Sequence, residues 1–332
     1  MRDVPLSVLD LSPIVEGGSV AESLANSVDL ARHAERLGYH RFWVAEHHGI
    51  PGVASAATAV VIAHVAGGTS SIRVGAGGIM LPNHAPLVIA EQFGTLEALF
   101  PGRVDLGLGR APGSDPVTAR ALRRDFAAGE AFPSDVAELI AFLEPAVAGQ
   151  AVRAVPGEGT RVPIWILGSS LFGAQLAAAM GLPFAFASHF APMHMMEAIE
   201  IYRAQFRPSE RCDEPRVMLG ATIVAADTDD EARWLFSSLV QTFAALRRGR
   251  PMRVPPPIEN VERQLTPFDR AQLEPILSHA IVGGPAQVRD GLAALLARTR
   301  ADEVIVATQI YDHAARVHAY EIAAEAMRSA AV

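Results

Sequence analysis

Lysine is absent from this chain, and all 28 of its basic residues are arginine. A Schiff-base mechanism and a phosphate loop ending in Gly-Lys-Ser/Thr are therefore excluded, because both need a lysine amine. Basic residues are also outnumbered, with 36 acidic residues and a net charge of -8. A protein that coats nucleic acid is expected to be basic, so the charge balance argues against that class.

Cysteine is nearly absent too, since Cys212 is the one cysteine in the sequence. It cannot form an intramolecular disulfide, and no CxxC redox pair or cysteine zinc cluster exists. Cys212 lies in a polar stretch, residues 208–215, and we interpret it as a loop residue rather than a nucleophile. Hydrophobic residues make up 50% of the chain and charged residues 19%, which indicates a folded domain rather than a disordered one.

Charge is missing altogether between Pro163 and Met196, which raises the question of a membrane span. Glycines, serines and a proline interrupt this stretch, so it is better interpreted as a buried strand, a helix and a second buried strand. The first ten residues lack the basic start and apolar core of a signal peptide. We expect a cytoplasmic, soluble protein without a membrane partner.

Short apolar runs with strand character alternate with longer helical patterns. The eight predicted strands are residues 5–10, 41–46, 72–80, 104–109, 163–167, 183–187, 217–225 and 303–308. Predicted helices cover residues 21–37, 86–99, 134–147, 171–180, 193–206, 229–246, 285–297 and 314–327. Continuous apolar strands are typical of parallel sheets that are covered on both faces.

This alternation predicts an α/β fold, a (β/α)8 TIM barrel that spans residues 1–332 as a single domain. An open doubly wound sheet is the alternative, but no GxGxxG motif follows the first strand. Two segments exceed ordinary connections, residues 111–133 and residues 247–279. The second precedes the last strand and contains three consecutive prolines, Pro255–Pro257. We interpret it as a lid-like insertion; a mobile surface insertion is the alternative.

Polar residues and two glycines gather where the predicted strands end, which is where TIM barrels place their active sites. These residues are Asp10, Glu46, His47, His48, Gly77, Gly78, Asn83, Arg110, Ser169, Ser170, Ser188, His189, Gln309 and Asp312. Neighbouring strand residues point to opposite faces, so at most one of His47 and His48 faces the barrel mouth. A histidine there can act as a general base or a hydrogen-bond donor. A metal site is the weaker reading, since HExxH is absent, and a capping histidine is a third.

Two further features point to a flat, phosphate-bearing ligand. Residues 74–80 form a strand with three glycines, and bare backbone often marks a bulge or the close approach of another body; tight helix–strand packing is the alternative. Arg110 ends the next strand, and Ser169 and Ser170 precede a helix. A guanidinium and a helix N-terminus from adjacent strands are suited to one phosphate group, although an ordinary N-cap and a surface ion pair would explain them too.

Several motifs together resemble the luciferase-like flavin-dependent monooxygenases of the bacterial luciferase superfamily. They are PLSVLD at residues 5–10, FWVAEHH at 42–48, IRVGAGGIMLP at 72–82, AE at 90–91, PGR at 101–103, LGLGRAPG at 106–113 and QIYDH at 309–313. The resemblance runs through nearly the whole chain. It is specific for the superfamily but says little about the substrate.

The resemblance implies an enzyme that uses reduced FMN, supplied by a separate flavin reductase, and O2 to oxidise a small organic substrate. It implies that His47 is catalytic and that residues 247–279 correspond to a mobile lid. It further implies a homodimer and a cis peptide bond between Gly77 and Gly78. The implied cofactor-binding residues are Gly77, Gly78, Met80, Arg110, Gly168, Ser169, Ser170 and Ser188.

Two positions depart from the family pattern. Gly109 stands where luciferases have a reactive cysteine, which argues against light emission with a long-chain aldehyde. Ser188 stands where they have a tryptophan beside the flavin, so the floor of the pocket is expected to differ too. Two alternatives share the fold: a deazaflavin-dependent dehydrogenase, which transfers hydride, and a flavin-binding protein without turnover. A metal hydrolase on the same barrel is disfavoured by the ligand spacing.

Overall fold

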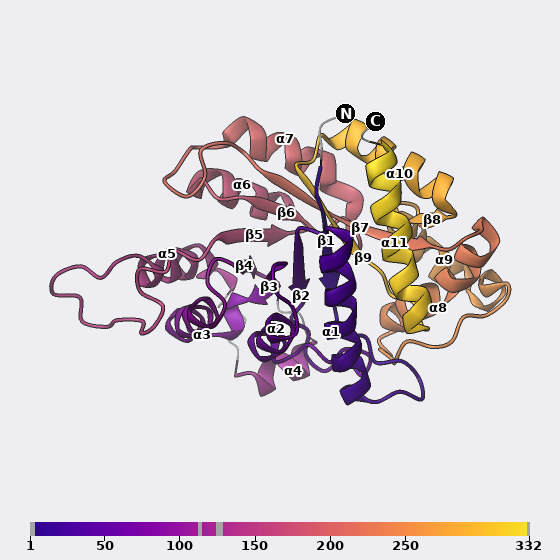
Figure 1. Cartoon of the computed structure of the whole chain (residues 1–332), viewed down its shortest axis with the longest axis horizontal. Helices are drawn as coiled ribbons and strands as arrows, with labels where there is room; N and C mark the ends of the chain where they lie inside the picture. The colour runs from indigo at the N-terminus through magenta and orange to yellow at the C-terminus, as the bar shows by residue number, and fades with distance from the viewer. Residues whose placement is uncertain (1–3, 112–114, 124–128, 331–332) are drawn as a thin grey trace.

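The computed structural model describes residues 4–111, 115–123 and 129–330; the two gaps fall within the long segment 111–133 noted above. Nine strands follow one another along the chain (Figure 1): β1 Leu6–Asp10, β2 Arg41–Val44, β3 Arg73–Met80, β4 Val104–Gly109, β5 Ile164–Gly168, β6 Phe184–Phe186, β7 Val217–Ala225, β8 Ile281–Gly283 and β9 Glu303–Ala307. Eight of them match the predicted strands to within two residues at most ends.

The strands form a closed ring. Their order is β6-β5-β4-β3-β2-β1-β9-β7, and the ring closes because β6 also pairs with β7. All of these pairings are parallel. The predicted TIM barrel is therefore confirmed. The sequence reading missed β8, a three-residue strand that pairs with β7 outside the ring.

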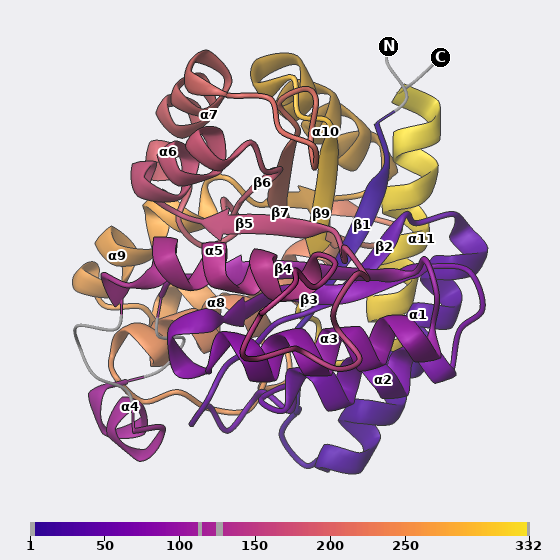
Figure 2. The same ribbon diagram turned by 90° about the vertical axis from the view of Figure 1, so that its left-hand side faces the viewer.

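Helices surround the ring on all sides (Figure 2). They are α1 Val20–Leu37, α2 Thr58–Gly67, α3 Pro86–Leu99, α4 Pro116–Ala121, α5 Phe132–Leu143, α6 Leu171–Met180, α7 Met195–Gln205, α8 Asp229–Arg247, α9 Pro267–Leu277, α10 Pro285–Thr299 and α11 His313–Ala330, with 3-10 turns η1 Leu81–Asn83, η3 Pro192–His194 and η4 Val261–Gln264. The sequence reading missed α2, whose nearly uniform apolar composition gives no clear stripe. It also missed α4 and α9.

Local signals explain where the first helix begins and ends. Ser19 accepts a hydrogen bond from the N–H of Glu22, and the Glu22 carboxylate accepts one from the N–H of Ser19. This reciprocal pair satisfies two backbone donors that the helix cannot satisfy itself. Gly38 ends the helix at φ +83, a left-handed conformation that favours glycine. The helix between them buries its apolar stripe against the barrel.

The charge-free stretch 163–196 has the expected organisation. It contains β5, α6 and β6, and then enters η3 and α7. Within the described residues, no helix is long and apolar enough to cross a membrane. The missing charges are explained by burial inside the fold, as in Ile166, Ala177 and Phe184, which are fully covered.

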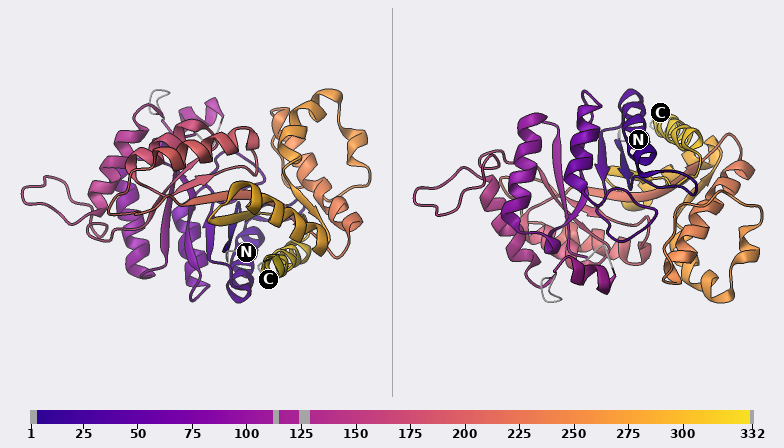
Figure 3. Two further views of the ribbon diagram at one scale, coloured as in Figure 1. Left: turned by 90° about the horizontal axis from the view of Figure 1, so that it is seen from above. Right: turned by 90° about the horizontal axis from the view of Figure 1, so that it is seen from below.

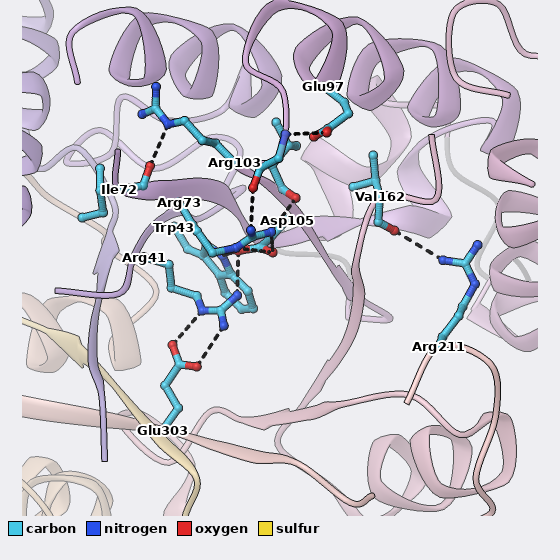
Figure 4. Close-up of polar contacts among 12 residues, drawn as sticks. Arg41, Trp43, Ile72, Arg73, Glu97, Arg103, Asp105, Val162, Arg211 and Glu303 are labelled. Carbon is cyan, nitrogen blue, oxygen red and sulfur yellow. Dashed lines mark hydrogen bonds and ion pairs between the residues drawn. The ribbon is translucent and has the colours of Figure 1, made fainter. Parts of the chain in front are cut away.

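The bottom of the barrel is filled by a buried charge cluster at the first residues of the strands (Figure 4). Arg41 donates to Glu303 at 2.7 Å and to Asp105 at 2.6 Å, and Arg73 donates to Asp105 at 2.5 Å. Trp43 donates its indole N–H to Asp105 at 3.3 Å. We call Arg41, Arg73, Asp105 and Glu303 the charge cluster; its two cations and two anions balance. It closes the end of the barrel opposite the predicted site.

Above the charge cluster the barrel interior is apolar. Trp43 and Trp165 pack edge to face with ring centroids 5.7 Å apart. The same interior cluster holds larger aliphatic side chains, Leu9, Met218 and Ile305, and the small residues Ala45, Ala185 and Ala307.

The lid-like segment 247–279 is more structured than the sequence reading expected. It contains η4 and α9, and α9 packs on α8 through the ion pair of Arg248 with Asp269 at 2.5 Å. Figure 3 shows α8 and α9 standing together at one side of the barrel. The first part of the segment is attached elsewhere, since Val254 forms a parallel bridge with Val15 in the loop after β1. Whether this segment moves stays a prediction.

Candidate active site at the strand ends

Alternation along the strands decides which side chains face the barrel axis. On β2, Arg41 and Trp43 point inward, as does Ala45 just beyond it, so His47 continues the inward series. His48 turns outward, and its Nε2 atom lies 2.8 Å from a carboxylate oxygen of Glu46. That only one of the two histidines faces the mouth rests on this alternation and stays a prediction.

Glu46 is the polar centre of this rim, and the sequence reading gave it no role. Its buried carboxylate accepts hydrogen bonds from four groups of three different segments: His48, the backbone N–H of Met80 at 2.9 Å, the amide of Asn83 at 3.1 Å and His84 at 2.9 Å. Burial alone would raise the pKa of Glu46, but the hydrogen bonds from His84 and His48 lower it overall. Glu46 thus stays charged and joins the β2 end to the β3 end.

Two inward imidazoles have no hydrogen-bond partner at one nitrogen. The Nδ1 atoms of His47 and His189 are buried, and neither has a partner among the described residues. Burial lowers the pKa of His47, and burial together with the nearby His47 lowers the pKa of His189 to about 4. Both rings are therefore neutral at physiological pH, and His47 is near enough to His189 to contribute to its lower pKa.

The glycine-rich strand β3 has an irregular course, as the sequence predicted. The pairing with β4 shifts register between Ala76 and Ile79, and the Gly77–Gly78 peptide bond is cis. A Cβ atom at Gly77 would lie 2.6 Å from a methyl of Leu9, and one at Gly78 would lie 2.7 Å from the carbonyl of Gly107. The backbone contact thus favours glycine at position 78 independently of any ligand, whereas a side chain at position 77 would have to displace Leu9.

The predicted phosphate-binding residues come together in space. The Arg110 guanidinium lies over the ring of Phe172, 4.0 Å from its centroid, and Phe172 is in the first turn of α6. Ser170 is the N-cap of α6, yet its hydroxyl makes no capping hydrogen bond. The Arg110 guanidinium and the Ser170 hydroxyl therefore both lie at the N-terminus of α6. The sequence predicted this grouping as a phosphate site.

The remaining predicted cofactor residues have packing roles in the structure. A Cβ at Gly168 would lie 3.4 Å from Gly173, and the Met80 sulfur lies where a side chain at Gly109 would point, 2.9 Å from its Cβ position. Ser188 is buried, and its hydroxyl donates to the carbonyl of Gly220 at 2.6 Å. The hydroxyl of Ser188 is thus already used within the protein.

Other rim residues have structural roles. Asp10 is buried and forms an ion pair with the buried Arg316 at 2.6 Å, and Asp312 accepts the N–H of Ala315 at the start of α11. Gln309 keeps a buried amide oxygen without a partner among the described residues. Asp10 and Asp312 thus anchor the last helix rather than the site.

No group of three or more histidine, cysteine, aspartate or glutamate side chains in the described part of the chain is arranged to hold a metal ion. Cys212 is buried and donates to the carbonyl of Glu214, in the connection between α7 and β7. A cavity of about 460 Å³ lies beside the loops after β1 and β9. Its lining includes Glu16, Glu22 and Asp312, so it is unsuited to a phosphate.

A family model described as luciferase-like monooxygenase matches residues 5–303 of the chain. The chain is 54% identical to the uncharacterized protein YvbT of Bacillus subtilis, covering 99% of this chain and 98% of that protein. It is 51% identical to a luciferase-like monooxygenase of Escherichia coli, covering 97% and 96%. The crystal structure of apo-MsnO8 superimposes with a TM-score of 0.86 at 36% identity, covering 98% of both chains.

More distant proteins carry functional names. The chain is 31% identical to the N-acetyl-S-alkylcysteine monooxygenase of B. subtilis, covering 98% and 99% of the two chains. Its fold is shared, at 17% identity and a TM-score of 0.75, with the oxygenating constituent of a Pseudomonas putida diketocamphane monooxygenase in complex with FMN, which covers 98% of this chain and 97% of that chain. An F420-dependent secondary alcohol dehydrogenase shares the fold at 13% identity, with a TM-score of 0.71 and coverage of 98% and 100%.

Proposed function

Since the chain belongs to the luciferase-like monooxygenase family, we propose that it is an FMN-dependent monooxygenase. Reduced FMN would supply two electrons to O2, so that one oxygen atom enters an organic substrate and the other becomes water. One observation carries the proposal: the Arg110 guanidinium packs on Phe172 in the first turn of α6. This contact lies at the same end of the barrel as the neutral imidazole of His47.

The residues present fit a flavin phosphate. Arg110 is permanently charged and planar, and it can hold a phosphate through two parallel hydrogen bonds. The uncapped N-terminus of α6 presents backbone N–H groups and a partial positive charge. Ser169 and Ser170 lie at the same end and would add hydroxyl donors. These groups would hold the phosphate, while the β3 strand end would lie toward the ring system.

His47 would contact the reacting atoms as a neutral imidazole. Because burial lowers its pKa, it can accept a proton at pH 7 or donate through its protonated nitrogen. The charged Glu46 next to it in the chain holds His48 and His84 and so fixes the backbone on which His47 is mounted. The chain's contribution would be to orient the ligands and to hold or move one proton at His47.

Two partners belong to the proposal. A separate flavin reductase would deliver the reduced FMN, as the resemblance to the luciferase-like monooxygenases implies. We also propose a homodimer, supported by exposed apolar side chains on the neighbouring helices α2 and α3: Val60, Val88 and Leu99 are 70%, 42% and 61% exposed. Sedimentation of the purified protein tests the dimer.

The cofactor is tested by comparing ligands that differ in the phosphate alone. Arg110→Ala removes a charge-assisted contact that is typically about 1.5–3 kcal/mol, so the Kd of reduced FMN should rise tenfold or more. Binding of reduced riboflavin, which lacks the phosphate, should change much less. Arg32→Ala is the control, because Arg32 lies exposed on α1 and contacts the carbonyl of Gly68.

The reaction is tested with reduced FMN, O2 and a panel of organic compounds. The panel should include an N-acetyl-S-alkylcysteine, a cyclic ketone and a terpene, and the readout is the transfer of ¹⁸O from ¹⁸O2 into product. The deazaflavin alternative predicts the opposite preference, with tighter binding of F420 and oxygen-independent oxidation of an alcohol.

The binding comparison has its own contradicting outcome. If Arg110→Ala weakened the binding of reduced FMN and of reduced riboflavin equally, the assignment of Arg110 to the phosphate would be wrong.

A further inference from the structure

His189 is the second inward imidazole of the rim, and it comes from the opposite side of the barrel to His47. It follows β6 by three residues and lies against β7, whose inward residues include Met218, Gly220 and Thr222. In the ring order, β7 is four strands away from β3 in either direction. His189 therefore stands across the barrel mouth from the glycine-rich strand on which the flavin ring would lie.

The ring of His189 is seated in a notch in β7. A Cβ atom at Gly220 would lie 2.2 Å from Nδ1 of His189, 3.1 Å from Cε1 and 3.3 Å from Cγ. The ring thus fills the space that any side chain at position 220 would need. Two hydroxyls hold the backbone around it: Ser188 donates to the carbonyl of Gly220 at 2.6 Å, and Thr222 donates to the carbonyl of His189 at 3.1 Å.

The notch also decides which nitrogen of His189 carries the proton. Nδ1 is buried without a hydrogen-bond partner, and a Cα–H of Gly220 points toward it, since this hydrogen stands in the direction of the missing Cβ. A C–H group is a weak donor that favours a lone pair at Nδ1. A buried N–H without an acceptor would cost more. The proton is therefore on Nε2, the nitrogen turned away from Gly220.

We propose that His189 is a substrate-binding residue whose Nε2–H donates a hydrogen bond to a neutral acceptor atom of the organic substrate, across the mouth from the flavin. This inference rests on the proposed function, but it concerns a different side of the site. Within the described residues His189 has no ion-pair partner that would hold it as a cation. The neutral ring is therefore suited to bind a neutral acceptor group through its Nε2–H rather than an anion. Phe190, edge to face with His189 at 5.0 Å, would cover the apolar part of the substrate.

The first experiment does not need turnover. The protein is labelled with ¹⁵N-histidine, and long-range ¹H–¹⁵N NMR spectra are recorded from pH 6 to 8, with His189→Gln providing the assignment. The expected result is a neutral His189 ring protonated at Nε2 throughout this range. Dimethyl sulfoxide, a small neutral acceptor, should shift the Nε2–H signal in a saturable way, and acetate, an anion of similar size, should not.

Gly220→Ala tests the notch without changing the imidazole itself. The alanine methyl must displace the ring, so the response to dimethyl sulfoxide should be lost. Gly67→Ala is the matched control, because a Cβ there meets no atom within 4 Å. A ring protonated at Nδ1 or at both nitrogens at pH 7, an absent or unsaturable response in the wild type, or an unchanged response in Gly220→Ala would overturn the proposal.

The second experiment uses a compound that the wild-type enzyme oxidises in the panel above. His189→Leu should raise its KM tenfold or more while changing the Kd of reduced FMN less than twofold, and His189→Gln, which keeps an N–H donor, should recover part of the loss. Wild-type KM in His189→Leu would refute the role of His189 and leave the monooxygenase intact. Failure of the wild type to use reduced FMN would refute the proposed function, and the NMR result would still decide the role of His189.

Discussion

Replacing Asp105 by asparagine tests whether charge balance at the bottom of the barrel stabilises the fold. Asp105 is fully buried and accepts from Arg41 at 2.6 Å, from Arg73 at 2.5 Å and from Trp43 at 3.3 Å. Asparagine keeps the volume but removes one of the two negative charges. The charge cluster would then hold two guanidinium groups against Glu303 alone.

The expected loss in the free energy of unfolding follows from the net positive charge that Asp105→Asn leaves in the charge cluster. Removing one partner of a buried ion pair typically destabilises by about 3–5 kcal/mol, since the other charge is left without compensation. That is a large part of the roughly 5–15 kcal/mol by which proteins are stable. Urea unfolding at pH 7, followed by far-UV circular dichroism, measures the free energy of unfolding of Asp105→Asn against the wild type.

Two further variants make the test specific to charge balance. Arg41→Met together with Asp105→Asn removes one charge of each sign, so the double variant should lose less stability than the two single losses added together. Glu158→Gln breaks the exposed pair with Arg153 and should cost far less. A loss below about 1 kcal/mol in Asp105→Asn, or strict additivity in the double variant, would refute the reasoning from the buried-pair magnitude.

Three other outcomes follow from the structure. Because the chain has no lysine, trypsin can cut only after arginine, and we expect the first cut within residues 247–279, slowed by reduced FMN and substrate; equal rates with and without ligands would count against a lid. Burial alone would raise the pKa of Glu35, but hydrogen bonds from the N–H groups of Ser71, Ile72 and Ser70 lower it from its ordinary value of 4.5 to about 2. The stabilisation from Glu35 is therefore present above about pH 4.5 and lost as the pH falls toward 2, so the stability gap between wild type and Glu35→Gln should narrow over that range in acid titrations. Gly94→Ala should lower the midpoint of thermal unfolding, since its Cβ would lie 2.2 Å from the Cα of Gly157; an unchanged midpoint would contradict the close packing.

The barrel was predictable because each ring strand is a continuous apolar run bounded by helical patterns. The elements that were missed lack such a signal. In α2, exposed Val60 and buried Ile62 are equally apolar, so composition does not separate the faces. β8 has three residues, and two of them are only partly buried. α9 follows a proline-rich stretch that is typical of a loop, yet Thr266 caps it with a reciprocal bond to Asp269.

The site was predictable where neighbouring strands bring residues together, as with Arg110 and the start of α6. Long-range partners were not. Glu46 is hydrogen-bonded to His84, which lies 38 residues further along the chain. No local sequence pattern predicts this hydrogen bond. The His189 ring fits into the notch in β7 because Gly220 has no side chain. A single glycine within an apolar strand has several possible explanations, so the sequence does not predict this contact. Such pairings depend on register, which the sequence pattern does not fix.

The chain segment from the start of α8 to β8 leaves and returns beside the same strand, β7. It departs after β7 through α8, and it returns through β8, which pairs with β7 at Ile223, Val224 and Ala225. Because its two ends are held next to each other, its length can change without altering the register of β9 with β1. The entropy of closing a loop grows only slowly with its length, by about 0.6 kcal/mol per doubling. Evolution can therefore lengthen, shorten or exchange this segment as a unit while the barrel beneath it stays the same.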